Sequence, residues 1–428
     1  MSGSKRAVVI GASMAGVLAA SALQSVYDEV VIVERDSIAG RPSSRRGVGQ
    51  SKHAHGLLAR GSQAIEELVP GITAELLAGG ARSYDVLQQG NFYNHGQLMA
   101  HGVSDLRGLM VSRNLLEHTV RQSVLRMPAV RMVDGREVLG LLHETGVVLG
   151  VTCSGPDGVD TIEADLVVDT TGRVSKLASW LVAMGFQAPA EERVDVDLVY
   201  TTWTVTVPDH IAARHGGALV GPTPGNPRAA ALLWIEGNRW TATLAGYQGL
   251  RAPLSVEGFL EFAADLPTRH LHEVLSHAKF EEGPHVYRVP ANRRLRYDRL
   301  SRFPAGLLAL GDSMCVFNPL YGQGMTVSAL QALLLRACLT EGEEALARRF
   351  FAGAAEIIDV AWRIATDADS VVVGTANPEQ LSASEQMGHF HEAAAHDPEL
   401  ARQFLQVINF LEPSSSLVEA LRNRGGAA

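Results

Sequence analysis

Cysteine, lysine and long apolar runs are all scarce in this chain of 428 residues. Its three cysteines, Cys153, Cys315 and Cys338, are widely spaced and odd in number, which argues against a disulfide framework and against a cysteine-based zinc site. The net charge of -9 argues against a nucleic-acid partner, because phosphate binding needs a concentrated basic surface. No apolar stretch reaches the ~18 residues that span a bilayer. We therefore expect a cytoplasmic protein without stable membrane insertion.

The first forty residues predict a β-strand, a glycine-rich turn, a helix and a second strand. Residues 7–10 and 30–34 are β-branched runs, and residues 14–24 have helical character. Such a unit is typical of a parallel α/β sheet. The basic start and small apolar residues also resemble a signal peptide, but the second strand follows the helix directly, which favours the strand–turn–helix interpretation.

Later segments extend this organisation. Two further apolar strands end in aspartate and glycine, at residues 164–172 and 305–312. Runs rich in β-branched and aromatic residues predict antiparallel strands; they are residues 198–207, 229–236 and 239–246. The sequence thus predicts an α/β fold with an α+β insert. We expect a discontinuous Rossmann domain (1–75, 101–180 and 290–345), an inserted antiparallel-sheet substrate domain (76–100 and 181–289) and a helical C-terminal region (346–428).

The turn from Gly11 to Gly16 is the first candidate binding site. In a dinucleotide-binding turn the first glycine permits the bend and the last permits close packing of helix and strand. The middle glycine lets the backbone approach a pyrophosphate at the helix N-terminus. Ser13 holds that middle position here. Glu34 ends the second strand, where an acidic residue can accept hydrogen bonds from ribose hydroxyls. The alternative is an ordinary turn without a ligand.

Two other segments favour FAD over NAD. Residues 169–173 read Asp-Thr-Thr-Gly-Arg, and Gly311-Asp312-Ser313 leads into a second glycine-rich turn at residues 318–326. An aspartate at a strand end can accept from a ribityl hydroxyl, and the glycines let backbone N–H groups approach the pyrophosphate and the flavin edge. Together with the first turn, these segments resemble the three-part FAD signature of flavoprotein monooxygenases related to para-hydroxybenzoate hydroxylase.

The resemblance covers about residues 5–340 and implies a glutathione-reductase-like fold. Residues 311–330 are similar to squalene epoxidase and more similar to the bacterial polyether epoxidases of the lasalocid and monensin pathways. Residues 50–58 are similar to a segment of those epoxidases. By this resemblance, the residues expected to bind FAD are Gly11, Ser13, Gly16, Glu34, Arg35, Arg45, Arg46, Arg113, Val138, Asp312, Gly324 and Met325. Pro319 is expected at the reactive edge of the flavin.

Candidate substrate contacts are mostly aromatic. They are Phe92, Trp203, Trp234, Trp240, Phe317 and Asn318. Core packing is the alternative for each aromatic residue. His53 and His55 lack further ligands at metal spacing, so no metal site is expected.

The resemblance implies an FAD-dependent monooxygenase that uses molecular oxygen, with NAD(P)H or a partner flavin reductase as electron donor. It would use a flavin C4a-hydroperoxide to epoxidise an alkene of a hydrophobic polyketide- or terpenoid-like natural-product intermediate. No relay suited to forming a phenolate is visible in the sequence, which favours epoxidation over aromatic hydroxylation on the same scaffold. A flavin-dependent reductase or dehydrogenase and a non-catalytic flavin- or lipid-binding protein are further alternatives. A halogenase is disfavoured, because residues 203–208 match the Trp-x-Trp-x-Ile-Pro pattern only in part.

Overall fold

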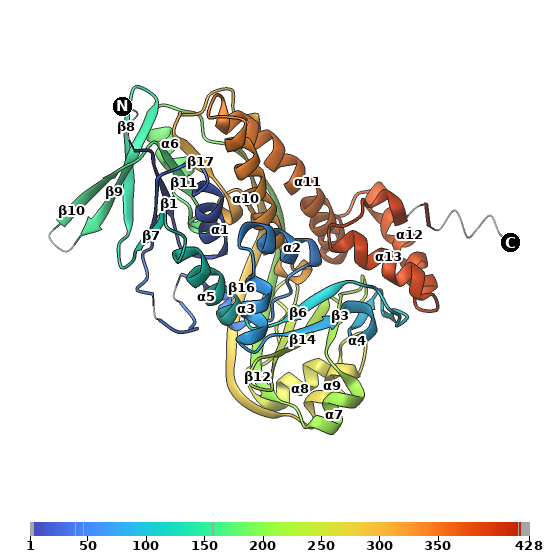
Figure 1. The fold of residues 1–428 in the computed structure, drawn as a ribbon. Coiled ribbons are helices and arrows are strands. Elements are labelled where there is room, and N and C mark those ends of the chain that lie inside the picture. Colours follow the sequence, from blue (N-terminus) through green and yellow to red (C-terminus); the bar gives the residue numbers. More distant parts are fainter. Residues whose placement is uncertain (1–3, 39, 46, 156–157, 418, 421–428) are drawn as a thin grey trace.

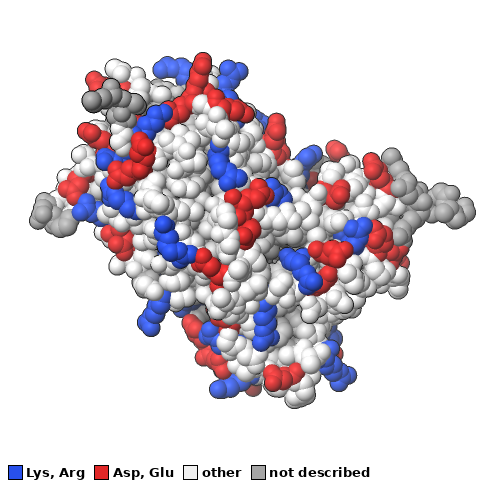
Figure 2. Space-filling model, viewed as in Figure 1, with Lys and Arg blue, Asp and Glu red and all other residues white. Residues whose placement is uncertain are grey.

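The computed structural model describes residues 4–38, 40–45, 47–155, 158–417 and 419–420. It has a mixed α/β architecture with a parallel sheet, three further sheets that are antiparallel or mainly so, and a helical C-terminal region (Figure 1). On the face seen in Figure 2, acidic and basic side chains are interspersed. In the described part of the chain, no helix combines the length and the apolar character needed to cross a membrane.

Five short strands form the parallel sheet, in the order β17-β11-β1-β2-β7. Their bounds are β1 Arg6–Ile10, β2 Glu29–Val33, β7 Val130–Val133, β11 Leu166–Asp169 and β17 Leu307–Ala309. The ends of β1, β2 and β11 align, because Ile10 pairs with both Asp169 and Val33. The strands predicted in the first, middle and late segments are confirmed, and their carboxyl ends meet at one edge of the sheet.

Both faces of this sheet are covered, which explains why its strands are apolar without alternation. Strand β9 (Val147–Gly155), from a small antiparallel sheet, contacts β11, and its Val148 and Val151 lie in the main core cluster. Helix α1 (Met14–Leu23) packs against α5 (Arg113–Leu125) and α10 (Gly324–Thr340). Val8, Val31 and Val168 are fully buried in the main core cluster. The shorter helical elements are α2 Ala59–Leu68, α3 Ile72–Ala78, α6 Leu177–Ala183, and the 3₁₀ turns η1 Gly49–Lys52, η2 Gly172–Val174, η3 Tyr297–Arg299, η4 Gly311–Ser313 and η5 Pro319–Tyr321.

A second, eight-stranded sheet has the order β18-β16-β12-β15-β14-β13-β4-β5. Its strands are β4 Asn91–Asn94, β5 Gln97–Leu98, β12 Ala190–Thr206, β13 Ala218–Val220, β14 Arg228–Ile235, β15 Arg239–Gly246, β16 Lys279–Arg296 and β18 Cys315–Val316. All neighbours pair antiparallel except β4 and β13. Strand β16 pairs with β12 almost from end to end. It therefore runs past residue 289, where the sequence predicted the inserted sheet to end.

Helices cover one face of the eight-stranded sheet. They are α7 Asp209–His215, α8 Val256–Ala264 and α9 His270–Leu275. Their side chains and those of the sheet form a second core cluster that includes Val205, Leu244 and Phe259. The opposite face carries Tyr200 and lies toward η5, since Tyr200 donates a hydrogen bond to Asn318.

Two small sheets were not predicted. One is three-stranded (β8 Val138–Glu144, β9 Val147–Gly155, β10 Gly158–Glu163), and one pairs β3 Arg82–Asp85 with β6 Arg107–Met110, beside α4 Val86–Gln89. The C-terminal region has the predicted helical character, with α11 Leu346–Val373, α12 Pro378–Ala394 and α13 Pro398–Ile408. In Figure 1, α11 runs from the side of α10 to the pair α12 and α13. Along the way it contacts β12 and β16.

Candidate functional site

The glycine-rich turn after β1 leaves no room for larger residues. Gly11 has a φ of +105°, a backbone conformation that favours glycine. A Cβ atom added to Gly16 would lie 1.9 Å from the carbonyl oxygen of Gly11, so the first turn of α1 packs directly on the bend. Ser13 precedes α1 in an extended conformation and does not cap the helix with its side chain. Its hydroxyl donates instead to Glu117 Oε1 at 2.5 Å.

Glu34, the predicted ribose acceptor, is buried at the end of β2. Its Oε2 accepts from the backbone N–H of Ala12 at 2.8 Å and from Arg45 Nη1 at 3.1 Å, and its Oε1 accepts from the N–H of Asp36 at 2.8 Å. The carboxylate therefore also holds the glycine-rich turn and the segment after β2 in place.

Glu117 on α5 is a site residue that sequence reasoning missed. Its carboxylate lies 2.8 Å from Arg113 Nη2 and 3.4 Å from Arg45 Nη2, and it accepts from the N–H of Met14 at 3.2 Å. Burial alone would raise its pKa, but the two arginines and the Ser13 hydroxyl outweigh burial and lower the pKa to about 2. A negative charge therefore sits at the N-terminus of α1, where the helix dipole favours it.

The cluster carries more positive than negative charge. Arg45, Arg113 and Arg121 surround Glu34 and Glu117, and the side chains of Arg45 and Arg113 are only 5% and 10% exposed. Among the described residues, the buried Nε atoms of Arg113 and Arg121 have no hydrogen-bond partner. Buried donors without partners are rare in folded proteins, so these two fit an anionic ligand such as the pyrophosphate of FAD.

One cavity collects most of the residues predicted to bind the nucleotide half of FAD. It lies at the carboxyl ends of β1 and β2, and its lining includes Gly11, Ser13, Glu34, Arg35, Arg45 and Val138. Thr171, from the Asp-Thr-Thr-Gly-Arg segment, lines it too, as do residues that sequence reasoning did not select, among them Arg136, Lys176 and Trp180. Trp180 comes from α6, a helix that carried no motif. Arg46 lies outside the described residues.

Asp312 lies near this cavity, in η4 after β17. A Cβ on Gly172 would be 3.5 Å from its Cβ, and a Cβ on Gly324 would be 3.8 Å from its Oδ1. Burial raises the pKa of Asp312, while the charges of Arg113 and Arg173 act against that rise. None of the hydrogen bonds formed within the described part of the chain reaches its carboxylate. Two open acceptor oxygens between glycines fit the hydroxyls of a ribityl chain.

The turn after η4 departs from expectation. Pro319 and Gly324 are half-buried, but Phe317 and Met325 are packed in the main core. Asn318, predicted to face substrate, has no exposed surface. Its side chain is fully used in hydrogen bonds, described below, because it caps η5 and joins the sheet to α11.

The structure places the predicted aromatic contacts in hydrophobic cores. Trp234 and Trp240 belong to the cluster under α7, α8 and α9, and Trp203 packs against that cluster with its ring 5.5 Å from Phe280. Phe92 packs against the cluster formed with α12 and α13. Since side chains alternate along a strand, Trp203 points away from the face that carries Thr202. Trp234 and Trp240 are thus buried as the core-packing alternative expects, whereas Trp203 and Phe92 are partly buried beside their clusters.

A polar chain covers the face of β12 opposite Trp203. His53 Nδ1 lies 2.7 Å from Thr202 Oγ1, which lies 2.8 Å from Thr243 Oγ1, and that atom accepts from the N–H of Ala54 at 3.0 Å. Burial, with a contribution from His285, lowers the pKa of His53 to about 4, so the ring is neutral at pH 7. Within the described ranges, no group of three or more histidine, cysteine or acidic residues is arranged to hold a metal ion.

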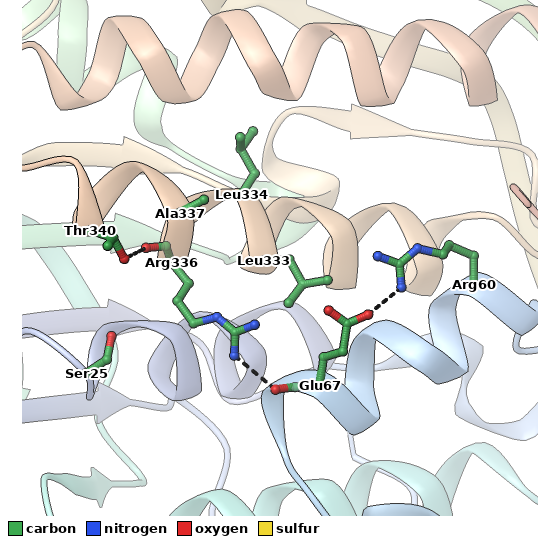
Figure 3. A pocket seen from close by; sticks show the side chains of 8 residues that line it. All are labelled: Ser25, Arg60, Glu67, Leu333, Leu334, Arg336, Ala337 and Thr340. Carbon is green, nitrogen blue, oxygen red and sulfur yellow. Dashed lines mark hydrogen bonds and ion pairs between the residues drawn. The ribbon is translucent and has the colours of Figure 1, made fainter.

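A second hollow lies between α2 and the end of α10 (Figure 3). Its charged side chains already have partners within the hollow: Arg60 forms an ion pair with Glu67 at 2.7 Å, and Arg336 donates to the Glu67 carbonyl oxygen at 2.9 Å. The α10 residues that line it lie at the end of that helix, from Leu333 to Thr340, whereas Gly324 begins α10 at its other end. We therefore place the candidate site at the strand ends.

Known proteins resemble this chain in sequence and in fold. No family model matches the chain. Protein Rv3254 of Mycobacterium tuberculosis is 32% identical over 426 residues, covering 95% of this chain and 90% of that protein. Squalene epoxidase 3 of Arabidopsis thaliana is 25% identical over 337 residues, covering 77% of this chain and 59% of that protein.

Solved structures share the architecture at low sequence identity. The flavin-dependent brominase Bmp2 has a TM-score of 0.70 at 12% identity, and each chain covers 99% of the other. The p-nitrophenol 4-monooxygenase PnpA from Pseudomonas putida DLL-E4 has a TM-score of 0.66 at 16% identity, covering 95% of this chain and 99% of that one. At such identities the likeness shows the fold alone. The closer resemblance to polyether epoxidases and the glutathione-reductase-like detail stay predictions.

Proposed function

Because this chain belongs to the family of Protein Rv3254 of Mycobacterium tuberculosis and has the fold of flavin-dependent monooxygenases, we propose that it is an FAD-dependent monooxygenase. Its substrate would be an alkene in a hydrophobic polyketide- or terpenoid-like intermediate, and its product the epoxide. Electrons would come from NAD(P)H or from a partner flavin reductase.

The observation that carries the proposal is the cavity at the strand ends. Residues from distant parts of the chain line it, and an excess of buried arginine lies beside it. In this arrangement Glu34 and Val138 would hold the adenosine, and Arg113 would bind phosphate through its unpaired Nε. Asp312 would accept from the ribityl chain, and Gly324 would border the flavin.

Bound FAD would supply the redox chemistry and the activation of molecular oxygen. The protein's own residues would hold the reactants and exclude water. The N–H of Gly322, whose φ is +65°, donates to the Pro319 carbonyl oxygen. The N–H groups that would approach the ring are therefore those of the first turn of α10, where Gly324 places no Cβ in the way. Pro319 would border the reactive edge of the ring.

The pKa values of the side chains on the polar face of β12 favour epoxidation over ring hydroxylation. An efficient general base has a pKa near the working pH. Burial lowers the pKa of His53 to about 4 and raises the pKa values of Tyr200 and Tyr287 above their ordinary value. None of these three is suited to take a proton from a phenol at pH 7, whereas an isolated alkene needs no such base. The similarity to squalene epoxidase over 77% of the chain supports the same assignment.

Oxygen activation is tested by stopped-flow absorbance. The reduced holoenzyme is mixed with oxygenated buffer, with and without a polyene such as squalene. A transient absorbing species before oxidised flavin returns, together with an epoxide identified by mass spectrometry, is the expected result. Hydroxylated product from a phenol panel but none from polyenes would move the assignment to aromatic hydroxylation. Direct reoxidation without a transient or product would favour a reductase or dehydrogenase.

The cofactor assignment is tested separately with Asp312→Ala. We expect the purified variant to retain less FAD than the wild type, because an open acceptor facing the cofactor is lost. Asp298→Ala is the matched control, since Asp298 is a carboxylate already paired with Arg296 at 2.6 Å and lies outside the cavity. Full FAD retention in Asp312→Ala would remove Asp312 from the site.

A further inference from the structure

A buried polar network lies directly behind η5. Its centre is Asp369 on α11, which has no exposed surface. Asp369 Oδ1 accepts from the hydroxyls of Tyr247 and Tyr321, each at 2.8 Å, and from Asn318 Nδ2 at 2.9 Å. Its Oδ2 accepts from Asn292 Nδ2 at 2.6 Å. Four donors from three parts of the fold thus meet on one carboxylate: Tyr247 follows β15, Asn292 is in β16, and Asn318 and Tyr321 belong to the turn of η5.

The network holds both ends of the turn. At its start, the N–H of Asn318 donates to Asn292 Oδ1 at 2.6 Å, and Asn318 Oδ1 accepts from Tyr200 at 3.2 Å and from the N–H of Leu320 at 3.0 Å. At its end, Tyr321 is held by Asp369 directly. Any displacement of Asp369 is therefore transmitted to both ends of the segment that leads into α10.

Asp369 lacks a cationic partner. Among the described residues, no lysine, arginine or histidine forms an ion pair with it, and burial raises its pKa although its four hydrogen bonds act in the opposite direction. Apolar side chains pack around the same region, including Leu198, Leu320 and Val372. A buried carboxyl group costs stability that apolar packing would not, but a fully satisfied polar network rigidifies a unique arrangement.

The network holds in place the segment of residues 318–322, which lies next to the proposed flavin site. Gly322 follows Tyr321 directly, and Gly324, two residues further on, lies beside Asp312. A Cβ on Gly322 would be 3.6 Å from the carbonyl oxygen of Gly56, so the turn also faces the loop that follows His53. A shift of the turn would change the space between these two segments.

We propose that Asp369 is a positioning residue: through Asn318 and Tyr321 it sets the turn of residues 318–322 against which flavin and substrate bind. This inference rests on the proposed function for its catalytic consequence, but the position of the turn can be measured in the protein with or without cofactor.

The variants are Asp369→Asn and the milder Tyr321→Phe. Asparagine keeps the size of the side chain but presents an NH₂ group to at least one of the four donors. Asn292 cannot turn its amide to compensate, because its Oδ1 already holds the N–H of Asn318. Asp85→Asn is the matched control: Asp85 is also buried and accepts several hydrogen bonds, but it caps α4 rather than η5.

Four measurements are made on each full-length protein: thermal stability, hydrogen exchange of the peptide covering residues 318–324, the visible spectrum of bound FAD, and the fraction of electrons lost as hydrogen peroxide. We expect both network variants to speed exchange in that peptide, shift the flavin bands and raise the peroxide fraction several-fold. Asp85→Asn should lose comparable stability without any of these changes.

Unchanged exchange in the peptide, or faster exchange with an unchanged flavin spectrum and peroxide fraction, would overturn the positioning role. If Asp369→Asn does not fold, the same comparison is made with Tyr321→Phe. A wild-type protein that binds no FAD would contradict the proposed function, and exchange in the peptide would then decide alone whether Asp369 anchors the turn.

Discussion

Replacing Glu117 with glutamine should cost about 3 kcal/mol of folding stability. The pKa of Glu117 falls from 4.5 to about 2 in the folded chain, and each tenfold change in acidity corresponds to about 1.4 kcal/mol. Glutamine resembles the protonated form of the side chain, so the variant lacks the stabilisation that the ionised carboxylate provides. Removing one partner of a buried ion pair costs about 3–5 kcal/mol in other proteins, which agrees with the value worked from the pKa.

The assay is thermal unfolding of both proteins at pH 7. At about 2.1 cal/mol/K per residue, a chain of 428 residues has an unfolding entropy of about 0.9 kcal/mol/K. A loss of about 3 kcal/mol therefore lowers Tm by about 3 °C if the chain unfolds as one unit. The pKa of Glu117 is lower in the folded chain than in the unfolded chain. Its ionised carboxylate therefore stabilises the fold fully above pH 4.5, and this stabilisation is lost as the pH falls toward 2. The difference between wild type and variant should thus narrow below pH 4.5.

Glu75→Gln is the control for the loss of an ion pair as such. Glu75 pairs with Arg126 on the surface, where its side chain is 41% exposed, and exposed pairs contribute at most about 1 kcal/mol. Its Tm should change by no more than about 1 °C. Equal shifts for the two variants, or a gap that does not narrow in acid, would refute the electrostatic account of the cluster around Glu117.

Three further outcomes are expected. Gly16→Ala should lower FAD retention, because the added Cβ would lie 1.9 Å from a backbone carbonyl oxygen. Gly225→Ala is the control and should retain FAD, because a Cβ on Gly225 meets nothing within 4 Å. His391→Phe should reduce the loss of Tm between pH 7 and pH 5. Burial lowers the pKa of His391 to about 3. Between pH 6.5 and pH 5 the unfolded wild type therefore binds a proton at this residue and the folded wild type does not, which costs about 2 kcal/mol of folding stability by pH 5. An equal loss of Tm in the wild type and in His391→Phe would contradict this. Trp203→Phe should leave the KM for an alkene unchanged, because its ring packs on Phe280, and a raised KM would return Trp203 to the substrate site.

The parts of the fold that follow from local pattern were predictable. Strand β1, helix α1 and strand β2 lie within a residue of their predicted bounds, because each is short, apolar and separated by a turn with its own glycine signature. Strand β11 and strand β17 were found for the same reason. The cavity residues Gly11 and Glu34 followed from this local order, since parallel strands bring their carboxyl ends together.

Residues whose role depends on a distant partner were missed. Glu117 lies four residues after Arg113, a spacing that predicts a helical ion pair, but nothing local indicates that Ser13 and Arg45 meet it. Asp369 is one acidic residue in a long helix, and its role depends on four donors that are 48 or more residues away in sequence. The signal that was available is its place on the buried face of α11, where an unpaired acid needs an explanation.

The misplaced tryptophans show why strand pattern alone could not locate the substrate face. In β12 both faces are buried along residues 198–202, so alternation separates Thr202 from Trp203 without saying which of them meets the cofactor. That choice is made by elements elsewhere in the chain: α8 and α9 cover the face of Trp203, and the hydrogen bond from Tyr200 to Asn318 turns the other face toward η5. Side chains two residues apart in a strand lie on the same face, so Thr202 lies on the face of Tyr200. The polar face, with its hydroxyls and the neutral ring of His53, is therefore where substitutions should change catalysis rather than stability.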